Sequence, residues 1–229
     1  MEFFKFAGSI LPRLINAAGV TLELTACAIT LGFTVGIFLA LGRVYGNRPI
    51  RAVTSVYVQF FRGTPLLAQL LLIYYGLPPY LAMVGLKITP FVAAIFGLGL
   101  NSAAYQAEYF RGAIQSIESG QMMAARSIGL SKIKAIRHII LPQALRIVIP
   151  SWSNELIYSI KYSSLAYFLS LTELTFEGKK IALHTARTFD TYVIVAIIYL
   201  VIVLVVSRLL LILENRVRVP GLGGNAEHR

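Results

Sequence analysis

Charged residues and cysteine are both scarce in this chain of 229 residues. Charged residues make up 14% of it and hydrophobic residues 57%, whereas soluble domains contain about a quarter charged residues. The single cysteine, Cys27, excludes an internal disulfide bond, and we expect it to serve in packing. The apolar excess indicates that lipid is the solvent and that the protein is an all-α integral membrane protein.

The chain also lacks the motifs of nucleotide and metal sites. Gly178-Lys179-Lys180 has no glycine five residues upstream and no following Ser or Thr, so it is not a phosphate-binding loop. His138 and His184 have no partners at ligand spacing, so we expect no metal and no cofactor on this chain. The first thirteen residues lack the features of a signal peptide, and we expect the N-terminus to be retained.

Acidic residues are outnumbered by basic ones, which gives a formal net charge of +11. The cations punctuate apolar runs and do not form one continuous face. This distribution favours anchoring against anionic lipid and argues against a nucleic-acid partner.

Five apolar stretches approach or exceed the ~20 residues that a spanning helix needs. Arg and Lys gather after the first, third and fifth stretches, and these connections are therefore expected in the cytoplasm. This places the N-terminus outside and the C-terminus inside. We expect one domain, 1–229, with a mobile tail at about 220–229. The stretches cover roughly residues 15–42, 53–77, 88–110, 146–168 and 190–213.

A polar segment at about 117–142 stands apart from the rest of the chain. Residues 120–128 are good helix formers, Gly129 can adopt the positive φ of a helix C-terminus, and Ser131 can cap a second helix. Pro142 cannot continue that helix undisturbed. The segment is therefore predicted to form a helical hairpin.

Apolar side chains on this hairpin predict a contact surface. Met122, Met123, Ile128 and Leu130 would form a soft knob that suits docking into a groove on another protein. An amphipathic helix lying at the lipid interface fits the same residues equally well.

The spacing of small residues in this hairpin resembles the EAA loop of ABC-transporter permeases. Two features of the spacing carry the match. Ala124 and Ala125 stand four to five positions before Gly129, and an Ile-x-Leu-Pro group, residues 139–142, follows it. The resemblance implies docking on an ATPase subunit and favours it over the lipid interface. Met123 stands where the motif usually carries glutamate, so that residue's salt bridge is not carried over. The coupling residues implied are Gly120, Met122, Met123, Ala124, Ala125, Gly129 and Leu130.

Four further segments, in order along the chain, resemble the polar amino-acid uptake permeases: residues 61–69, 100–105, 110–117 and 141–146. The resemblance implies the permease fold of a type I ABC importer with a cytoplasmic coupling hairpin, in the inner membrane of a prokaryote. It also implies two ATPase subunits, which hold ATP and Mg, and a second permease copy, identical or paralogous. An extracytoplasmic solute-binding protein would deliver the amino acid.

Polar groups from four spans are expected at a similar depth in the bilayer. At about 1.5 Å per residue, Arg62 lies about 16 Å and Glu155 about 13 Å from the cytoplasmic edge. Asn101 lies about 10 Å from that edge of a ~30 Å core, and Glu23 falls near the middle. Ionisable groups at such depth are costly and are functional candidates by default.

A zwitterionic amino acid needs a cation and an anion as partners. Arg62 or nearby backbone donors would bind the α-carboxylate, and Glu155 an ammonium or guanidinium group. The remaining substrate-binding candidates, which supply hydrogen bonds and aromatic faces, are Thr64, Asn101, Tyr105 and Tyr158.

A structural role for the same charges is the competing interpretation. Arg62 can instead neutralise Glu155 or Glu23 and hold the helices together. Glu108 and Arg111, three residues apart on one helix, are predicted to form a structural pair.

The choice of amino acid rests on a narrower resemblance. Asn154-Glu155 is similar to relatives that take basic amino acids, whereas Tyr162 replaces an aspartate found in some of them. A basic substrate is therefore expected, with glutamine or another neutral polar amino acid as the alternative. A membrane-embedded enzyme is disfavoured because the polar residues at depth offer no nucleophile–base pair. A passive channel has no use for a docking hairpin.

Overall fold

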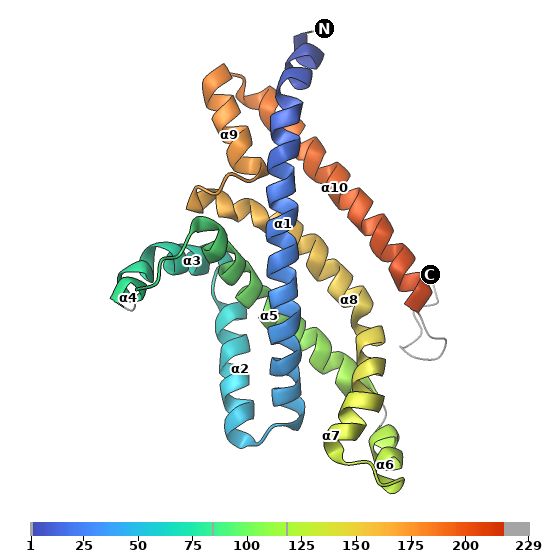
Figure 1. Cartoon of the computed structure of the whole chain (residues 1–229). Coiled ribbons are helices and arrows are strands. Elements are labelled where there is room, and N and C mark those ends of the chain that lie inside the picture. The colour runs from blue at the N-terminus through green and yellow to red at the C-terminus, as the bar shows by residue number, and fades with distance from the viewer. Residues whose placement is uncertain (1, 84, 118, 218–229) are drawn as a thin grey trace.

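The computed structural model describes residues 2–83, 85–117 and 119–217, and these residues form helices and short connections (Figure 1). The tail expected to be mobile, 220–229, lies outside the described residues. The α-helices are α1 (Glu2–Tyr45), α2 (Arg48–Gly63), α3 (Leu66–Leu71), α4 (Pro78–Met83), α5 (Pro90–Ser116), α6 (Ser119–Ser127), α7 (Lys132–Ala135), α8 (Leu141–Tyr162), α9 (Leu174–Thr185) and α10 (Thr188–Val217), with π-helical turns at Leu72–Gly76 and Ile136–Ile140 and a 3₁₀ segment at Ser163–Leu169.

Capping residues explain where several helices begin. The Asn47 side chain accepts a hydrogen bond from the Ile50 N–H at 3.1 Å and starts α2. Thr89 does the same for α5, with Pro90 at the first helical position. Glu173 accepts from two backbone N–H groups at the start of α9. Each cap satisfies donors that a helix start leaves without an internal partner.

The helices over the five predicted membrane spans differ in composition. Among the described residues, α1, the segment 66–83 and α10 are long and apolar enough to cross a membrane by themselves. Helices α5 and α8 have 27 and 22 residues, about 40 and 33 Å at the usual rise. They carry more polar groups because they pack inside the bundle, against α1 and each other.

The expectation of one continuous span at 53–77 is wrong. Helix α2 ends at Gly63, Thr64 and Pro65 are extended, and α3 starts at Leu66. The cause is Pro65, which lacks an N–H donor and forces the preceding residue out of the helical region.

Helix α1 runs the length of the molecule and packs against α5, which crosses it over part of that length (Figure 1). Two glycines on α1 permit this contact. A Cβ at Gly32 would lie 2.6 Å from Gln106 Nε2, and a Cβ at Gly36 would lie 3.1 Å from the Ala103 carbonyl oxygen. The Gly32–Gly36 spacing is thus a close-packing site, as such motifs are in other membrane proteins.

Replacing Gly36 with leucine should therefore destabilise the fold. The side chain would press on the backbone of α5, and overpacking of this kind costs roughly 1–3 kcal/mol. Thermal denaturation in detergent should show a lower midpoint than for the unmodified protein. The matched control is Gly19→Leu on the same helix, where an added Cβ meets nothing within 4 Å. Equal midpoints for both variants would contradict this account of the α1–α5 contact.

Helix α9 is fixed to the N-terminal half of α1, at the end of the molecule opposite α6 and α7 (Figure 1). The Arg13 guanidinium lies 2.6 Å from Glu177, and the Leu174 N–H donates to the Thr21 hydroxyl at 3.1 Å. Burial opposes ionisation of Glu177, yet its hydrogen bonds and ion pairs with Lys180 and Arg13 hold the pKa of that carboxyl below its usual value. Ion pairs and hydrogen bonds therefore fix α9 to α1 at this end of the molecule.

Candidate functional site

A polar cavity of about 470 Å³ lies where α1, α2 and α5 meet. Its charged groups are Arg43 from α1, Arg62 from the end of α2 and Glu108 from α5. Its other lining residues are Val58, Gln59, Gly63 and Tyr105. Two of the predicted substrate residues, Arg62 and Tyr105, therefore share one cavity.

Glu108 joins three helical segments through its carboxylate. It contacts Arg43 and Arg111, the latter at 2.7 Å, and lies 3.9 Å from Arg62. The predicted Glu108–Arg111 pair is confirmed. Three guanidinium groups surround one carboxylate, so the cavity has excess positive charge and favours an anion.

The competing interpretation, in which Arg62 neutralises Glu155 or Glu23, does not match the ion pairs of the described residues, where Arg62 lies near Glu108. Arg62 lies over the Tyr105 ring, with its central carbon 5.3 Å from the ring centroid, and reaches toward Glu108 on the same face of α5. Its side chain is 45% exposed, and its distance to Glu108 is the longest of the three ion pairs. Arg62 is consequently the cation most available to a ligand.

The carboxylate of Glu155 is buried between α8 and α5, with 6% of the residue exposed. Ser102 donates to its Oε1 at 2.7 Å, and Tyr109 donates to its Oε2 at 3.4 Å. Gln106 in turn donates to the Ser102 hydroxyl at 3.0 Å. These partners support a carboxylate at a depth where an isolated one would be costly.

Sequence reasoning missed four residues of this arrangement, and helical spacing could have found three. Ser102, Gln106 and Tyr109 lie on α5 at intervals of four and three residues, which places them on one face. Arg43 gave no such signal, because it approaches Glu108 from a helix 65 residues away.

One face of α5 joins the cation to the carboxylate. Tyr105 supports Arg62, and Tyr109, one turn further along, donates to Glu155. A rise of four residues is about 6 Å. The contacts to the cation and to the carboxylate thus lie on neighbouring turns of α5, while Arg62 comes from α2 and Glu155 from α8.

Thr64 and Asn101 occupy a separate network at the break between α2 and α3. The Gln69 amide donates to the Thr64 hydroxyl at 2.8 Å and to the Phe61 carbonyl at 2.9 Å. Asn101 donates to the same carbonyl at 3.1 Å and to the Gln69 side chain at 3.0 Å. Backbone groups freed by Pro65 are thereby satisfied inside the membrane layer.

Tyr158 lies on an exposed face of α8. Its ring stacks on Tyr162 with centroids 6.1 Å apart, and the Lys161 ammonium lies 4.4 Å from its centroid. Other exposed members of this face are Ser151 and Asn154. Polar side chains within a span face water or protein instead of lipid, so this face belongs to an aqueous path or an interface.

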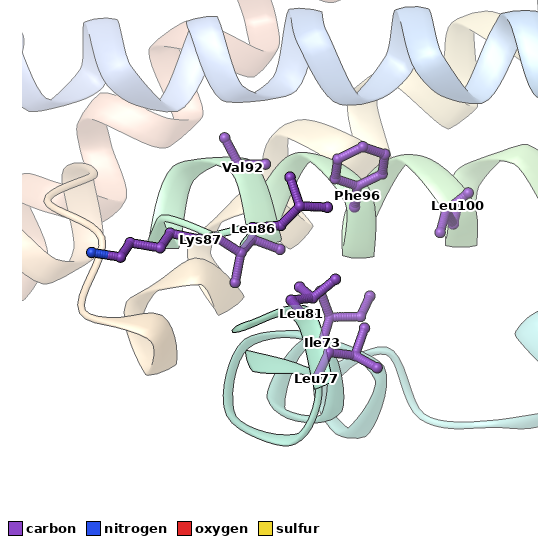
Figure 2. A pocket seen from close by; sticks show the side chains of 9 residues that line it. Ile73, Leu77, Leu81, Leu86, Lys87, Val92, Phe96 and Leu100 are labelled. Carbon is purple, nitrogen blue, oxygen red and sulfur yellow. The ribbon is translucent and has the colours of Figure 1, made fainter. Parts of the chain in front are cut away.

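A second hollow, of about 450 Å³, is apolar (Figure 2). Leucine, isoleucine, valine and phenylalanine side chains from the 73–81 segment, the 86–88 connection and α5 line it, and Lys87 lies at its rim. With no carboxylate and a single cation, it does not suit a zwitterion. The hollow and the polar cavity share no lining residue.

The predicted hairpin at 117–142 is confirmed for its described residues. Gly129 has a φ of +85° and follows α6, and the Ser131 hydroxyl accepts from the Lys134 N–H at the start of α7. The Leu130 N–H donates to the Ala125 carbonyl at 3.1 Å, which closes α6. Before Pro142, the Ile136–Ile140 π-helical turn absorbs the disturbance expected from proline.

The apolar surface of the hairpin differs from the expected one. Met123 and Ile128 are 63% and 77% exposed, and Ile133, which was not predicted, is 78% exposed. Met122 packs against the cluster around Phe110, and Leu130 is half-buried. Met122 points inward because it lies three residues from buried Ala125, on the face of α6 that packs against the bundle. The exposed surface is therefore Met123, Ile128 and Ile133, at the end of the molecule remote from the N-terminus (Figure 1).

Comparisons with known proteins give relatives that match nearly the whole chain. The Probable amino-acid permease protein YxeN of Bacillus subtilis is 40% identical over 217 residues, which cover 95% of this chain and 96% of that protein. The Glutamine transport system permease protein GlnP of Escherichia coli is 37% identical, with 91% and 94% covered. A chain from the crystal structure of an amino acid ABC transporter with histidines superposes with a TM-score of 0.83 at 39% identity, covering 94% of this chain and 99% of that one.

The family model for the binding-protein-dependent transport system inner membrane component matches residues 32–219, most of the chain. With the near full-length relatives, this match assigns the helical bundle and its hairpin to the all-α permease fold of ABC importers. The chain is accordingly a membrane component and not an enzyme. It belongs to the family of binding-protein-dependent transport system inner membrane components, as a permease subunit of an ABC transporter.

Proposed function

We propose that this permease moves a polar amino acid, of the basic class, into the cytoplasm by alternating access. The observation that carries the proposal is the α5 face on which Tyr105 supports Arg62 and Tyr109 donates to Glu155. A basic amino acid offers a carboxylate to Arg62 and a cationic side chain to Glu155. Charge-assisted hydrogen bonds of both kinds are the stronger class in proteins.

The basic preference rests on the carboxylate of Glu155. Among the described residues, no Lys or Arg forms an ion pair with it. A substrate cation would supply the missing counter-charge at a site where burial makes an unpaired charge costly. Glutamine is the second candidate, because the similar GlnP is a glutamine transport permease and an amide can also hydrogen-bond a carboxylate.

The remaining predicted residues take supporting roles in this proposal. Tyr158, on the exposed face of α8, would offer its ring to the substrate cation in the aqueous path. Thr64 and Asn101 would shape the frame of the site at the α2–α3 break, since their polar atoms already bond within the chain.

The partners follow from the two ends of the molecule. We place α6 and α7 in the cytoplasm, where two ATPase subunits would hold ATP and Mg and grip the surface of Met123, Ile128 and Ile133. Gly120, Met122, Ala124, Ala125, Gly129 and Leu130 would keep that surface in shape. The opposite end, with α9 and the N-terminus outside, would receive the solute-binding protein. A second permease copy, identical or paralogous, would lie across the aqueous path from the polar face of α8.

Movement would pass from the hairpin to the site through one continuous element. Helix α7, the Ile136–Ile140 turn and α8 follow one another without a break, and α8 carries Glu155. Closure of the ATPase subunits would shift the hairpin and tilt α8 against α5. Glu155 and Arg62 would then be exposed alternately to the two sides.

Reconstitution tests the substrate directly. The complete transporter, with its ATPase and binding protein, is placed in proteoliposomes and offered radiolabelled arginine, histidine, lysine and glutamine. ATP-dependent uptake of arginine, lysine or histidine in preference to glutamine is the expected result. Uptake of glutamine alone would replace the basic class by the second candidate, and uptake of none of the four would overturn the proposal.

Replacing Ile128 or Ile133 by aspartate should weaken attachment of the ATPase. Each change buries a charge in an apolar contact, and we expect a roughly five- to tenfold loss of affinity, about 1–1.4 kcal/mol. Co-purification and binding of the ATPase to the solubilised permease measure it. Ile50→Asp is the control, because Ile50 is exposed near the α1–α2 connection and outside the hairpin. Unchanged binding in both hairpin variants would contradict the docking surface.

A further inference from the structure

We infer that Ser102 and Gln106 are positioning residues that hold the Glu155 carboxylate for the substrate and thereby set the preference for cationic over neutral amino acids. The inference rests on the proposed role of Glu155. It adds two residues that touch no substrate and act through that carboxylate alone.

A chain of hydrogen bonds leads from the backbone of α1 to Glu155. Gln106 Nε2 lies 3.4 Å from the Ile29 carbonyl oxygen and donates to Ser102 Oγ at 3.0 Å. Ser102 then donates to Glu155 Oε1 at 2.7 Å, the shortest bond of the series. Gln106 is fully buried and Ser102 nearly so. The chain therefore crosses three helices, α1, α5 and α8, without reaching the surface.

The direction of the Ser102 hydroxyl follows from its neighbours. A serine hydroxyl has one hydrogen to donate. Because Gln106 donates an N–H to Ser102 Oγ, the Ser102 hydrogen is left for Glu155 Oε1. Ser102 is thus an obligatory donor to the carboxylate.

Gln106 itself has little freedom to turn away. Gly32 and Gly36 bring the backbone of α1 against it, and a Cβ at either glycine would lie within 3.0 Å of Gln106 atoms. The close contact between α1 and α5 therefore fixes the amide that orients Ser102. The packing of α1 against α5 therefore helps to set the orientation of the Glu155 carboxylate through Gln106 and Ser102.

The second carboxylate oxygen is the one left for a ligand. Glu155 Oε2 receives only the 3.4 Å contact from Tyr109, which is near the limit of a hydrogen bond. Holding Oε1 on Ser102 directs Oε2 toward Tyr109, which lies one turn along α5 from Tyr105, the residue under Arg62 of α2. An ammonium or guanidinium group bound there gains a charge-assisted bond that a neutral side chain does not.

A double-mutant cycle tests the inference on the assembled permease–ATPase complex without binding protein. The dissociation constants of arginine and glutamine are measured by calorimetry for Ser102→Ala, Glu155→Gln and the double variant. We expect Ser102→Ala to weaken arginine binding about fivefold and to leave glutamine binding within twofold. In the Glu155→Gln background, Ser102→Ala should add nothing, because the two residues act as one unit.

Two further variants separate positioning from loss of structure. Ser163→Ala removes another fully buried hydroxyl, one that donates to the Ile160 carbonyl, and should leave the arginine-to-glutamine ratio unchanged. Ser102→Cys, close in size with a weaker donor, should give an intermediate ratio.

A Ser102→Ala variant that weakens the binding of arginine and glutamine equally, or that adds its full effect to that of Glu155→Gln, would overturn the inference. If Glu155→Gln itself leaves the ratio unchanged, the proposed role of Glu155 fails as well; if only Ser102→Ala leaves it unchanged, this inference fails alone.

Discussion

Glu155→Gln is expected to reduce arginine uptake by roughly 10- to 150-fold while glutamine uptake stays within about twofold. Hydrogen bonds to charged groups contribute about 1.5–3 kcal/mol, which corresponds to this range of fold-changes. The substituted amide keeps the size of the carboxylate and can still accept from Ser102, while the charge is lost and one acceptor oxygen becomes an NH2 donor. Uptake of both amino acids into proteoliposomes that contain the complete transporter measures the effect.

The control for this change is Glu23→Gln, which removes an exposed carboxylate from α1, another membrane helix. It should leave both uptake rates close to those of the unmodified transporter. Assembly with the ATPase is checked for each variant by size-exclusion chromatography. An assembled Glu155→Gln transporter that takes up arginine normally would refute the assignment of Glu155 as the substrate's counter-charge.

Local signals in the sequence were sufficient for the hairpin. The cap at Ser131 and the positive φ of Gly129 each depend on residues a few positions away, and both are present in the structure. The Glu108–Arg111 pair was predictable for the same reason, since three residues separate its members on one helix. Where chemistry and spacing act within one or two turns, the chain can be interpreted directly.

The α2–α3 break was also signalled locally, but hydropathy obscured it. Pro65 stands inside the apolar run 53–77, and a proline with its preceding residue restricted is a known point of helix termination. The run is apolar on both sides of the break because both helices lie in the membrane layer. Composition therefore predicted the layer correctly and the continuity of the helix incorrectly.

Contacts between segments far apart in the chain could not be predicted from the sequence. Arg43 reaches Glu108 across 65 residues, and Ser102 reaches Glu155 across 53. Depth in the bilayer placed Arg62 and Glu155 at similar levels, but depth says nothing about rotation around each helix axis. Arg62 therefore lies near Glu108 of α5 and not near Glu155. For the same reason Met122, which was expected in the docking surface, packs against the bundle.

Gly129→Val is expected to uncouple the transporter: ATP hydrolysis continues while amino-acid uptake falls at least about tenfold. Gly129 has a φ of +85°, which a β-branched residue adopts only at a cost of roughly 1–3 kcal/mol. An added Cβ there meets nothing within 4 Å, so the penalty is conformational and not steric. Relief of the strain would break the Leu130-to-Ala125 backbone bond that closes α6. Ile128 and Ile133 would then no longer present one surface.

The number of amino acids transported per ATP hydrolysed, measured in proteoliposomes, is the relevant quantity for this variant. The matched control is Gly129→Asn, because asparagine is one of the few residues with a side chain that enters the left-handed region readily. Asparagine adds a side chain similar in size to that of valine at the same position, yet it should retain most of the coupling. If the valine variant transported as many amino acids per ATP as the unmodified protein, the hairpin geometry at Gly129 would have no part in transmitting the motion. If both variants lost coupling equally, bulk and not backbone conformation would be the property that matters at this position.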